Sequence, residues 1–210
     1  MKLTDLMIYL RRERVFDLPL LEVISSQNRN TLKVQLHRWI ADGKVVALRR
    51  GLYTLAEGLS EPKQGAQLAN LMVNPSYLTG LWAMSFYGMI PEAVYEYTSA
   101  TPSYKQAYEN EFGRFSYRKL KADVFRGWED VEYGSTPLRI ATPAKAVLDH
   151  LYWTGGDALQ TLRVLRFQPD GVPGFSWEKL IQCAQEWGSP RLVRFAKMAP
   201  EEFSGAWEEL

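Results

Sequence analysis

Amide, basic and imidazole side chains, the groups that bind phosphates and base edges, are concentrated in one stretch near the N-terminus. Residues 28–42 have the apolar spacing of a helix. At 100° per residue, most of these side chains lie on the face opposite Leu32 or at the margins of that face. Two arginines follow just before Gly51. The candidate DNA-contacting residues are Gln27, Asn28, Arg29, Asn30, Lys33, His37, Arg38, Arg49 and Arg50.

Three helices and a hairpin are expected to position these side chains. Apolar residues recur at helical spacing in three segments, Gly43 ends the third, and two short apolar runs flank the turn of Arg49, Arg50 and Gly51. The expected elements are helices at 2–12, 19–24 and 28–42 and strands at 45–48 and 52–55. This order predicts a winged helix-turn-helix DNA-binding domain at residues 1–57.

In such a domain the third helix enters the major groove, and the arginines of the hairpin contact the phosphate backbone or a minor groove. Val34 sits in the middle of the outer face of the helix, where it would contact a thymine methyl group or pack against a second domain. A plainer interpretation is a solvated helix face and a charged turn that keeps an edge strand soluble.

The distribution of charge favours a polyanion as the ligand of the N-terminal domain. Residues 1–55 have ten Lys and Arg against five Asp and Glu, a net charge of +5. Residues 56–210 have fifteen against nineteen, a net charge of −4, so the whole chain carries only +1. A surplus of positive charge in a small N-terminal unit is typical of nucleic-acid binding, although a solvated surface has it too.

A polar break at 57–62 separates this domain from a second one, expected at residues 63–210. Helical periodicity there predicts helices at 64–72, 79–87, 143–152, 157–167, 176–187 and 190–198. Extended or alternating segments are expected at 76–78, 94–99, 112–120, 122–126, 131–133 and 138–141. The whole chain is therefore expected to be α+β, with a winged helix-turn-helix, a mixed α+β domain and a helical C-terminal end.

The second domain has no recognisable catalytic constellation. Asp149 and His150 are neighbours within a helix and point about 100° apart, so they are not a ready acid–base pair. The triplet Glu61-Pro62-Lys63 resembles a nuclease metal strand but falls in the linker, and Gly155-Gly156 lacks a phosphate-binding pattern. With one cysteine and two histidines in the chain, we expect no metal site, no cofactor and no enzymatic activity.

Nothing in the sequence predicts a membrane segment or an exported chain. Uncharged apolar runs do not approach about 18 residues, and charged residues crowd the short apolar run at the N-terminus. We therefore expect a cytoplasmic protein without membrane contact, present as a monomer or a weak dimer.

Three motifs in this order resemble the AbiEi family of transcriptional-regulator antitoxins. They are Arg49-Arg50-Gly51-Leu52-Tyr53, Pro75-Ser76-Tyr77-Leu78-Thr79-Gly80-Leu81-Trp82-Ala83 and Thr142-Pro143-Ala144-Lys145-Ala146-Val147-Leu148-Asp149. The resemblance spans roughly residues 5 to 155 and concerns type IV toxin–antitoxin and abortive phage-infection systems. It implies a repressor of its own operon that binds double-stranded DNA at operator repeats, with a C-terminal domain that counters a cognate nucleotidyltransferase-like toxin.

Two other functional classes stay open at this point. The chain would be a ligand-sensing winged-helix repressor if the aromatic second domain bound a small molecule. It would be a nucleic-acid-processing enzyme if the winged helix only delivered that domain to its substrate. Cleavage of a plasmid with metal, or release of DNA by a metabolite, would distinguish these classes from the antitoxin.

Overall fold

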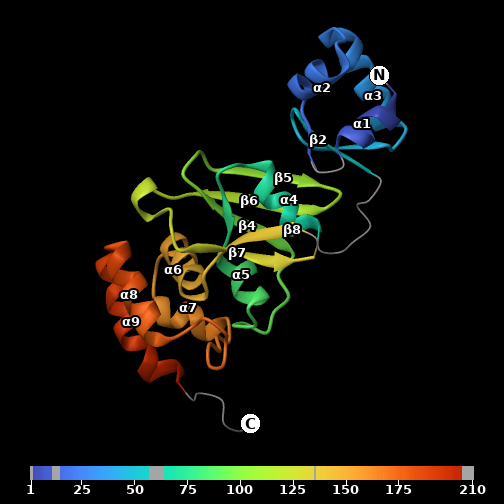
Figure 1. Ribbon diagram of the computed structural model, residues 1–210. Helices are drawn as coiled ribbons and strands as arrows, with labels where there is room; N and C mark the ends of the chain where they lie inside the picture. Colours follow the sequence, from blue (N-terminus) through green and yellow to red (C-terminus); the bar gives the residue numbers. More distant parts are fainter. Residues whose placement is uncertain (1, 11–14, 57–63, 135, 205–210) are drawn as a thin grey trace.

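The computed structural model describes residues 2–10, 15–56, 64–134 and 136–204, and it shows a mixed α+β fold with helices at both ends (Figure 1). We call residues 2–10 and 15–56 the N-terminal unit, and residues 64–134 and 136–204 the body. The predicted linker at 57–62, the triplet Glu61-Pro62-Lys63 and the predicted end of the first helix lie outside the described residues.

The N-terminal unit consists of three helices followed by a two-stranded antiparallel hairpin. Its elements are α1 (Leu3–Tyr9), α2 (Leu18–Ser25), α3 (Arg29–Ala41), β1 (Val45–Arg49) and β2 (Leu52–Leu55). The periodicity of the sequence therefore locates all five elements of this unit to within a few residues.

Local capping explains where α2 and α3 begin. The Asp17 carboxylate accepts a hydrogen bond from the Leu20 N–H at 2.9 Å, and the Asn28 side chain accepts one from the Thr31 N–H at 2.9 Å. Each satisfies a backbone donor that the first helical turn leaves unpaired. The helices then pack around one apolar cluster of Leu6, Leu10, Phe16, Leu18, Leu21, Leu32, Leu36, Trp39 and Val45.

A six-stranded mixed sheet forms the centre of the body, in the order β5-β6-β4-β3-β8-β7. The pairs β4–β6 and β3–β8 are parallel, and the other neighbours are antiparallel. The strands are β3 (Tyr77–Leu78), β4 (Glu96–Thr101), β5 (Gln106–Asn110), β6 (Gly113–Lys119), β7 (Trp128–Tyr133) and β8 (Thr136–Ala141).

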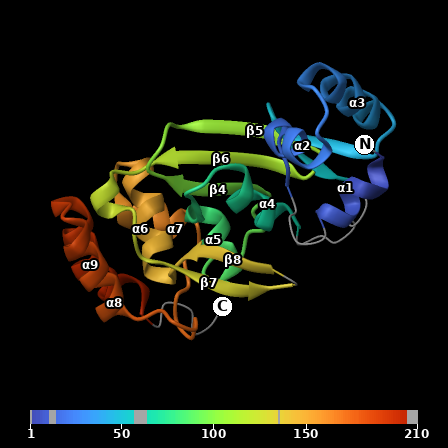
Figure 2. The ribbon, with the colours of Figure 1, turned by 45° about the horizontal axis from the view of Figure 1, so that its top comes forward.

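Six helices accompany this sheet, and the last two lie at the end of the molecule remote from α1–α3 (Figures 1 and 2). They are α4 (Gln64–Met72), α5 (Gly80–Phe86), α6 (Pro143–Thr154), α7 (Ala158–Val164), α8 (Trp177–Trp187) and α9 (Pro190–Phe203). A second apolar cluster joins the sheet to these helices. The helical C-terminal end expected from the sequence is thus confirmed.

Three details differ from the sequence predictions. Residues 122–126, predicted as a strand, instead include a turn of 3-10 helix at Ala122–Val124, where the Val124 N–H bonds to the Lys121 carbonyl. The strand β5 was not predicted, because this edge strand is half-buried and largely polar and lacks apolar alternation. The helix predicted to end at residue 198 continues to Phe203, since its apolar stripe continues past Pro200.

A buried ion pair stands at the junction of several elements of the body. The Lys145 ammonium of α6 lies 2.8 Å from the Asp149 carboxylate, and both side chains are almost fully buried. Lys145 also donates to the Val124 carbonyl at 2.9 Å and lies 3.5 Å from the centre of the Trp187 ring. The hydroxyls of Tyr77 and Thr79 donate to Asp149 at 3.0 and 2.8 Å. One network therefore connects β3, the 3-10 turn at Ala122–Val124, α6 and α8.

Burial opposes the charge of both members of this pair. It lowers the pKa of the Lys145 ammonium and raises the pKa of the Asp149 carboxyl, while each charge favours the ionised form of the other. The surrounding hydroxyls and the Val124 carbonyl replace the lost water. Such a pair is costly to break, because the remaining charge has no compensation.

Asp149→Asn is therefore expected to destabilise the body strongly. The amide keeps the shape and one acceptor oxygen but leaves the buried ammonium without a counter-charge, at a cost of about 3–5 kcal/mol. Lys44→Ala is the matched control, since its ion pair with Asp42 has the same 2.8 Å separation but about half of each side chain is exposed. It should cost less than about 1 kcal/mol. Urea unfolding of both variants measures the difference, and equal costs would contradict this role.

His150 gives the stability a dependence on pH. Burial, and to a smaller extent the nearby positive charge of Arg118, lowers the pKa of His150 from 6.5 to about 4. Between these values the unfolded chain binds a proton that the folded chain does not, so the free energy of unfolding falls as the pH falls below 6.5. From pH 7 to pH 5 this loss amounts to at most about 2 kcal/mol.

His150→Gln should remove this part of the pH dependence. Urea unfolding at pH 7 and pH 5 is expected to show a difference smaller by up to about 2 kcal/mol than in the unmodified chain. His37→Gln removes an exposed imidazole of α3 and keeps His150, so the full dependence should persist in that control. Identical pH profiles for all three proteins would exclude His150 as the source.

Candidate nucleic-acid interface

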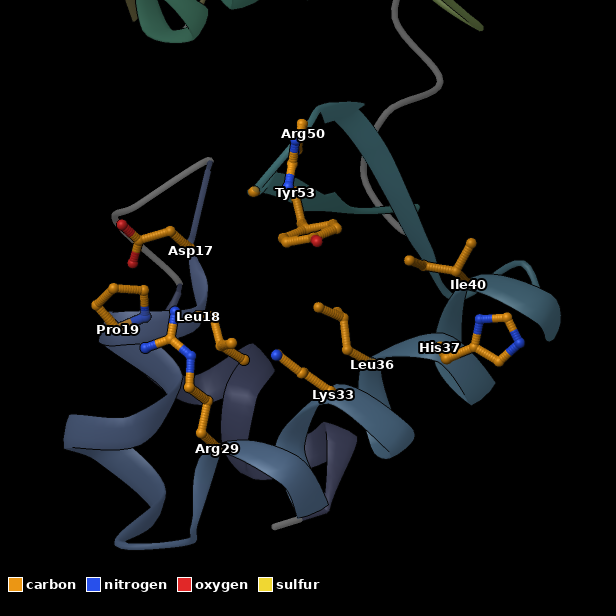
Figure 3. A pocket seen from close by; sticks show the side chains of 11 residues that line it. Asp17, Leu18, Pro19, Arg29, Lys33, Leu36, His37, Ile40, Arg50 and Tyr53 are labelled. Atoms are coloured by element: carbon orange, nitrogen blue, oxygen red, sulfur yellow. The ribbon is translucent and has the colours of Figure 1, made fainter.

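A groove of 510 Å³ lies between the start of α2, one side of α3 and the turn of the hairpin (Figure 3). Residues from all three elements line it, although the hairpin and α2 are separated by more than twenty positions in the chain. The lining residues are Asp17, Leu18, Pro19, Arg29, Lys33, Leu36, His37, Ile40, Arg50, Gly51 and Tyr53.

One stripe of α3 supplies two positive charges and an imidazole to the groove. Arg29, Lys33 and His37 are spaced four residues apart, which places them one above another along the helix. All three are exposed, and Figure 3 shows the Lys33 side chain reaching into the groove. Arg29 also pairs with Glu22 at 3.4 Å, but this exposed pair is weak enough for the arginine to exchange partners.

Arg50 brings a further positive charge from the hairpin. Its side chain is exposed and lies across the groove from α3 (Figure 3). The hairpin is held in place because the backbones of Phe16 and Tyr53 exchange two hydrogen bonds of 2.8 Å. The Tyr53 ring also packs against Phe16, with 5.9 Å between ring centroids. These contacts hold the hairpin, and with it the turn of Arg50, against the segment that precedes α2.

The end of the groove at α2 carries a negative charge, from a residue that is not among the sequence-predicted contacts. Asp17 lines the groove at the start of α2, where its carboxylate caps the helix. Pro19 follows it and has no N–H to offer to an anion. The start of α2 is therefore unsuited to a phosphate, and the favourable path for one runs between α3 and Arg50. A helix-cap signal at Asp17 was visible in the sequence.

Five of the nine predicted residues do not line this groove, and four of them belong to α3 or the turn before it. Asn28 caps α3, with its side-chain oxygen bonded to both the N–H and the hydroxyl of Thr31 at 2.9 and 3.1 Å. Gln27 is half-buried in the turn before α3. Asn30 and Arg38 are exposed on α3 without lining the groove, so they widen the polar surface of the helix.

The two arginines of the hairpin turn have different surroundings. Whereas Arg50 lines the groove, the half-buried Arg49 donates from Nε to the carbonyl oxygen of Met72 in the body at 2.7 Å. Its Nη1 lies 3.3 Å from the Arg50 carbonyl oxygen. The structure thus brings together Arg29, Lys33, His37 and Arg50 and engages Arg49 elsewhere.

The sequence matches no model of a known protein family, and a search of curated proteins gives no match either. Among the residues that the structure describes, no helix is long and apolar enough to cross a membrane. Within the same residues, no group of three or more His, Cys, Asp or Glu side chains is arranged to hold a metal ion.

Proposed function

We propose that the N-terminal unit is a winged helix-turn-helix that binds duplex DNA. The observation that carries this proposal is the groove lined by Arg29, Lys33 and His37 from one helix and by Arg50 from the hairpin. Phosphate oxygens are the ligands that best complement the exposed cations Arg29, Lys33 and Arg50. The order of three helices and a hairpin supports the same assignment.

In this proposal α3 lies in the major groove, which admits a helix, and Arg50 contacts the adjacent backbone. Asn30 and His37 supply groups that read base edges from the exposed face of α3. Val34, with 54% of its surface exposed on this helix, offers an apolar contact to a thymine methyl group. Lys33, Arg29 and Arg38 neutralise phosphates, which fixes the register of the helix on the duplex.

The biological role that we propose is that of a repressor and antitoxin. The three sequence motifs that resemble AbiEi antitoxins support autoregulation at operator repeats through the N-terminal unit. They also support a body that counters a nucleotidyltransferase-type toxin. A monomer or weak dimer is sufficient for this role, because operator repeats can be filled by separate copies.

The binding of DNA is expected to depend steeply on salt. If Arg29, Lys33, Arg38 and Arg50 each neutralise one phosphate, log K falls with log salt concentration at a slope of about −3.6. Between 50 and 200 mM salt the affinity then falls about 150-fold. Footprinting and titration on the DNA upstream of the protein's own coding sequence measure both quantities.

Lys33→Ala and Arg50→Ala should each make the salt slope shallower by about 0.9, because each removes one phosphate contact. Lys197→Ala is the matched control, since it removes one exposed charge from α9, remote from the groove. It should leave the slope unchanged. A slope that is close to zero in the unmodified protein, or the same in all variants, would contradict the proposed interface.

The antitoxin role predicts that DNA binding and neutralisation are separable. The double variant Lys33→Ala/Arg50→Ala should lose repression, because both residues belong to the proposed DNA interface. It should still protect cells that express the proposed cognate nucleotidyltransferase-type toxin, because the proposed neutralising unit is the body. Reporter activity and colony counts after co-expression measure the two effects. Loss of protection in this variant, with the protein still folded and present, would contradict the division of roles.

A further inference from the structure

The strand β1 belongs to both apolar clusters of the molecule. Val45, at its beginning, is buried in the cluster of the N-terminal unit. Leu48, three residues later, has only 1% of its surface exposed and packs in the cluster of the body. A strand of five residues therefore extends from one core into the other, next to β5 at the edge of the sheet (Figure 2).

An irregularity in the hairpin directs β1 toward the body. The pairing of the two strands shifts between Ala47 and Arg49, so Leu48 has no partner in β2. Extra residues of this kind bend a strand and turn its side chains in new directions. The Leu48 carbonyl oxygen accepts a hydrogen bond of 3.0 Å from the side-chain amide of Asn110, the last residue of β5.

Asn110 is itself held firmly in the body. Its side-chain oxygen accepts a hydrogen bond from the Phe112 N–H at 2.9 Å, which fixes the turn between β5 and β6. The side chain is half-buried, and its amide nitrogen lies 3.9 Å from the Met72 sulfur. The amide thus connects a rigid turn of the sheet to the backbone of the hairpin.

Arg49 makes the second connection at the end of a helix. Met72, whose carbonyl accepts the 2.7 Å hydrogen bond from Arg49 Nε, is the last residue of α4 and is fully buried. Carbonyls at the end of a helix lack a partner within the helix, and a cation there also meets the negative end of the helix dipole. This carbonyl is therefore a favourable acceptor for a guanidinium group, and Arg50, the next residue, remains exposed beside the groove.

We propose that Arg49 and Asn110 are positioning residues, which fix the hairpin and its Arg50 against the body and so set the orientation of the groove. This inference rests on the proposed function for its effect on DNA. The joint itself consists of contacts within the chain and can be measured without DNA. In this arrangement Arg49 takes no part in neutralising phosphates.

NMR relaxation of backbone amides in the full chain tests the joint. The unmodified protein is expected to give one rotational correlation time for both parts. In Arg49→Met/Asn110→Ala, which removes both donors and keeps most of the apolar contact, the N-terminal unit should tumble about twofold faster than the body, as a smaller compact unit does. The single variant Arg49→Lys, which retains a donor, should keep one rotational correlation time for both parts. Arg50→Ala is the matched control and should also keep it.

DNA binding by the single variants distinguishes positioning from direct contact. Arg49→Met should weaken binding several-fold at an unchanged salt slope, whereas Arg50→Ala makes the slope shallower by about 0.9. A single correlation time in the double variant, or a slope in Arg49→Met reduced as in Arg50→Ala, would overturn the proposal. If the double variant decouples the two parts and the unmodified chain binds no DNA, the joint is supported and the proposed function fails. Urea unfolding of the body verifies that each variant is folded.

Discussion

The burial of one short strand in two cores is the constraint on which the arrangement of this protein depends. Leu48 enters the core of the body at the residue where the hairpin is irregular. The same irregularity turns Arg49 toward Met72 and leaves Arg50 beside α3. Adjacent residues of the turn thus act on different parts of the molecule.

The buried network of the body accounts for two of the sequence motifs. Tyr77 and Thr79 belong to the motif at residues 75–83, and Lys145 and Asp149 belong to the motif at residues 142–149. Together these four side chains form one hydrogen-bonded cluster in the core. None of these four residues lines the groove of the N-terminal unit. An apolar core would often be as stable as a buried ion pair, so the value of the network lies in specifying how β3 and α6 meet. The residues of these two motifs therefore have a structural role in the core of the body.

The sequence predicts elements better than it predicts their partners. Apolar periodicity locates α1, α2 and α3 because each buries one stripe in a local core. It misses β5 because this edge strand has no fully buried residue and is largely polar, so its sequence lacks apolar alternation. Four of the nine candidate residues, Arg29, Lys33, His37 and Arg50, line one groove. Helical spacing predicts that the first three share one stripe of α3, and the turn before Gly51 predicts the place of Arg50. The engagement of Arg49 depends on Met72, a contact between distant residues that no local pattern encodes.

Counting charges along the chain overstates the positive potential that the groove presents. The surplus of the first 55 residues includes Arg49, which is directed to a carbonyl of the body, and Arg29 shares its charge with Glu22. Asp17 adds a negative charge at the far end of the groove. The positive charges that remain in the groove form a narrow band that includes Lys33 and Arg50. In the DNA complex that we propose, a phosphate backbone must follow that band closely, so position along the groove matters more to the proposed interface than net charge.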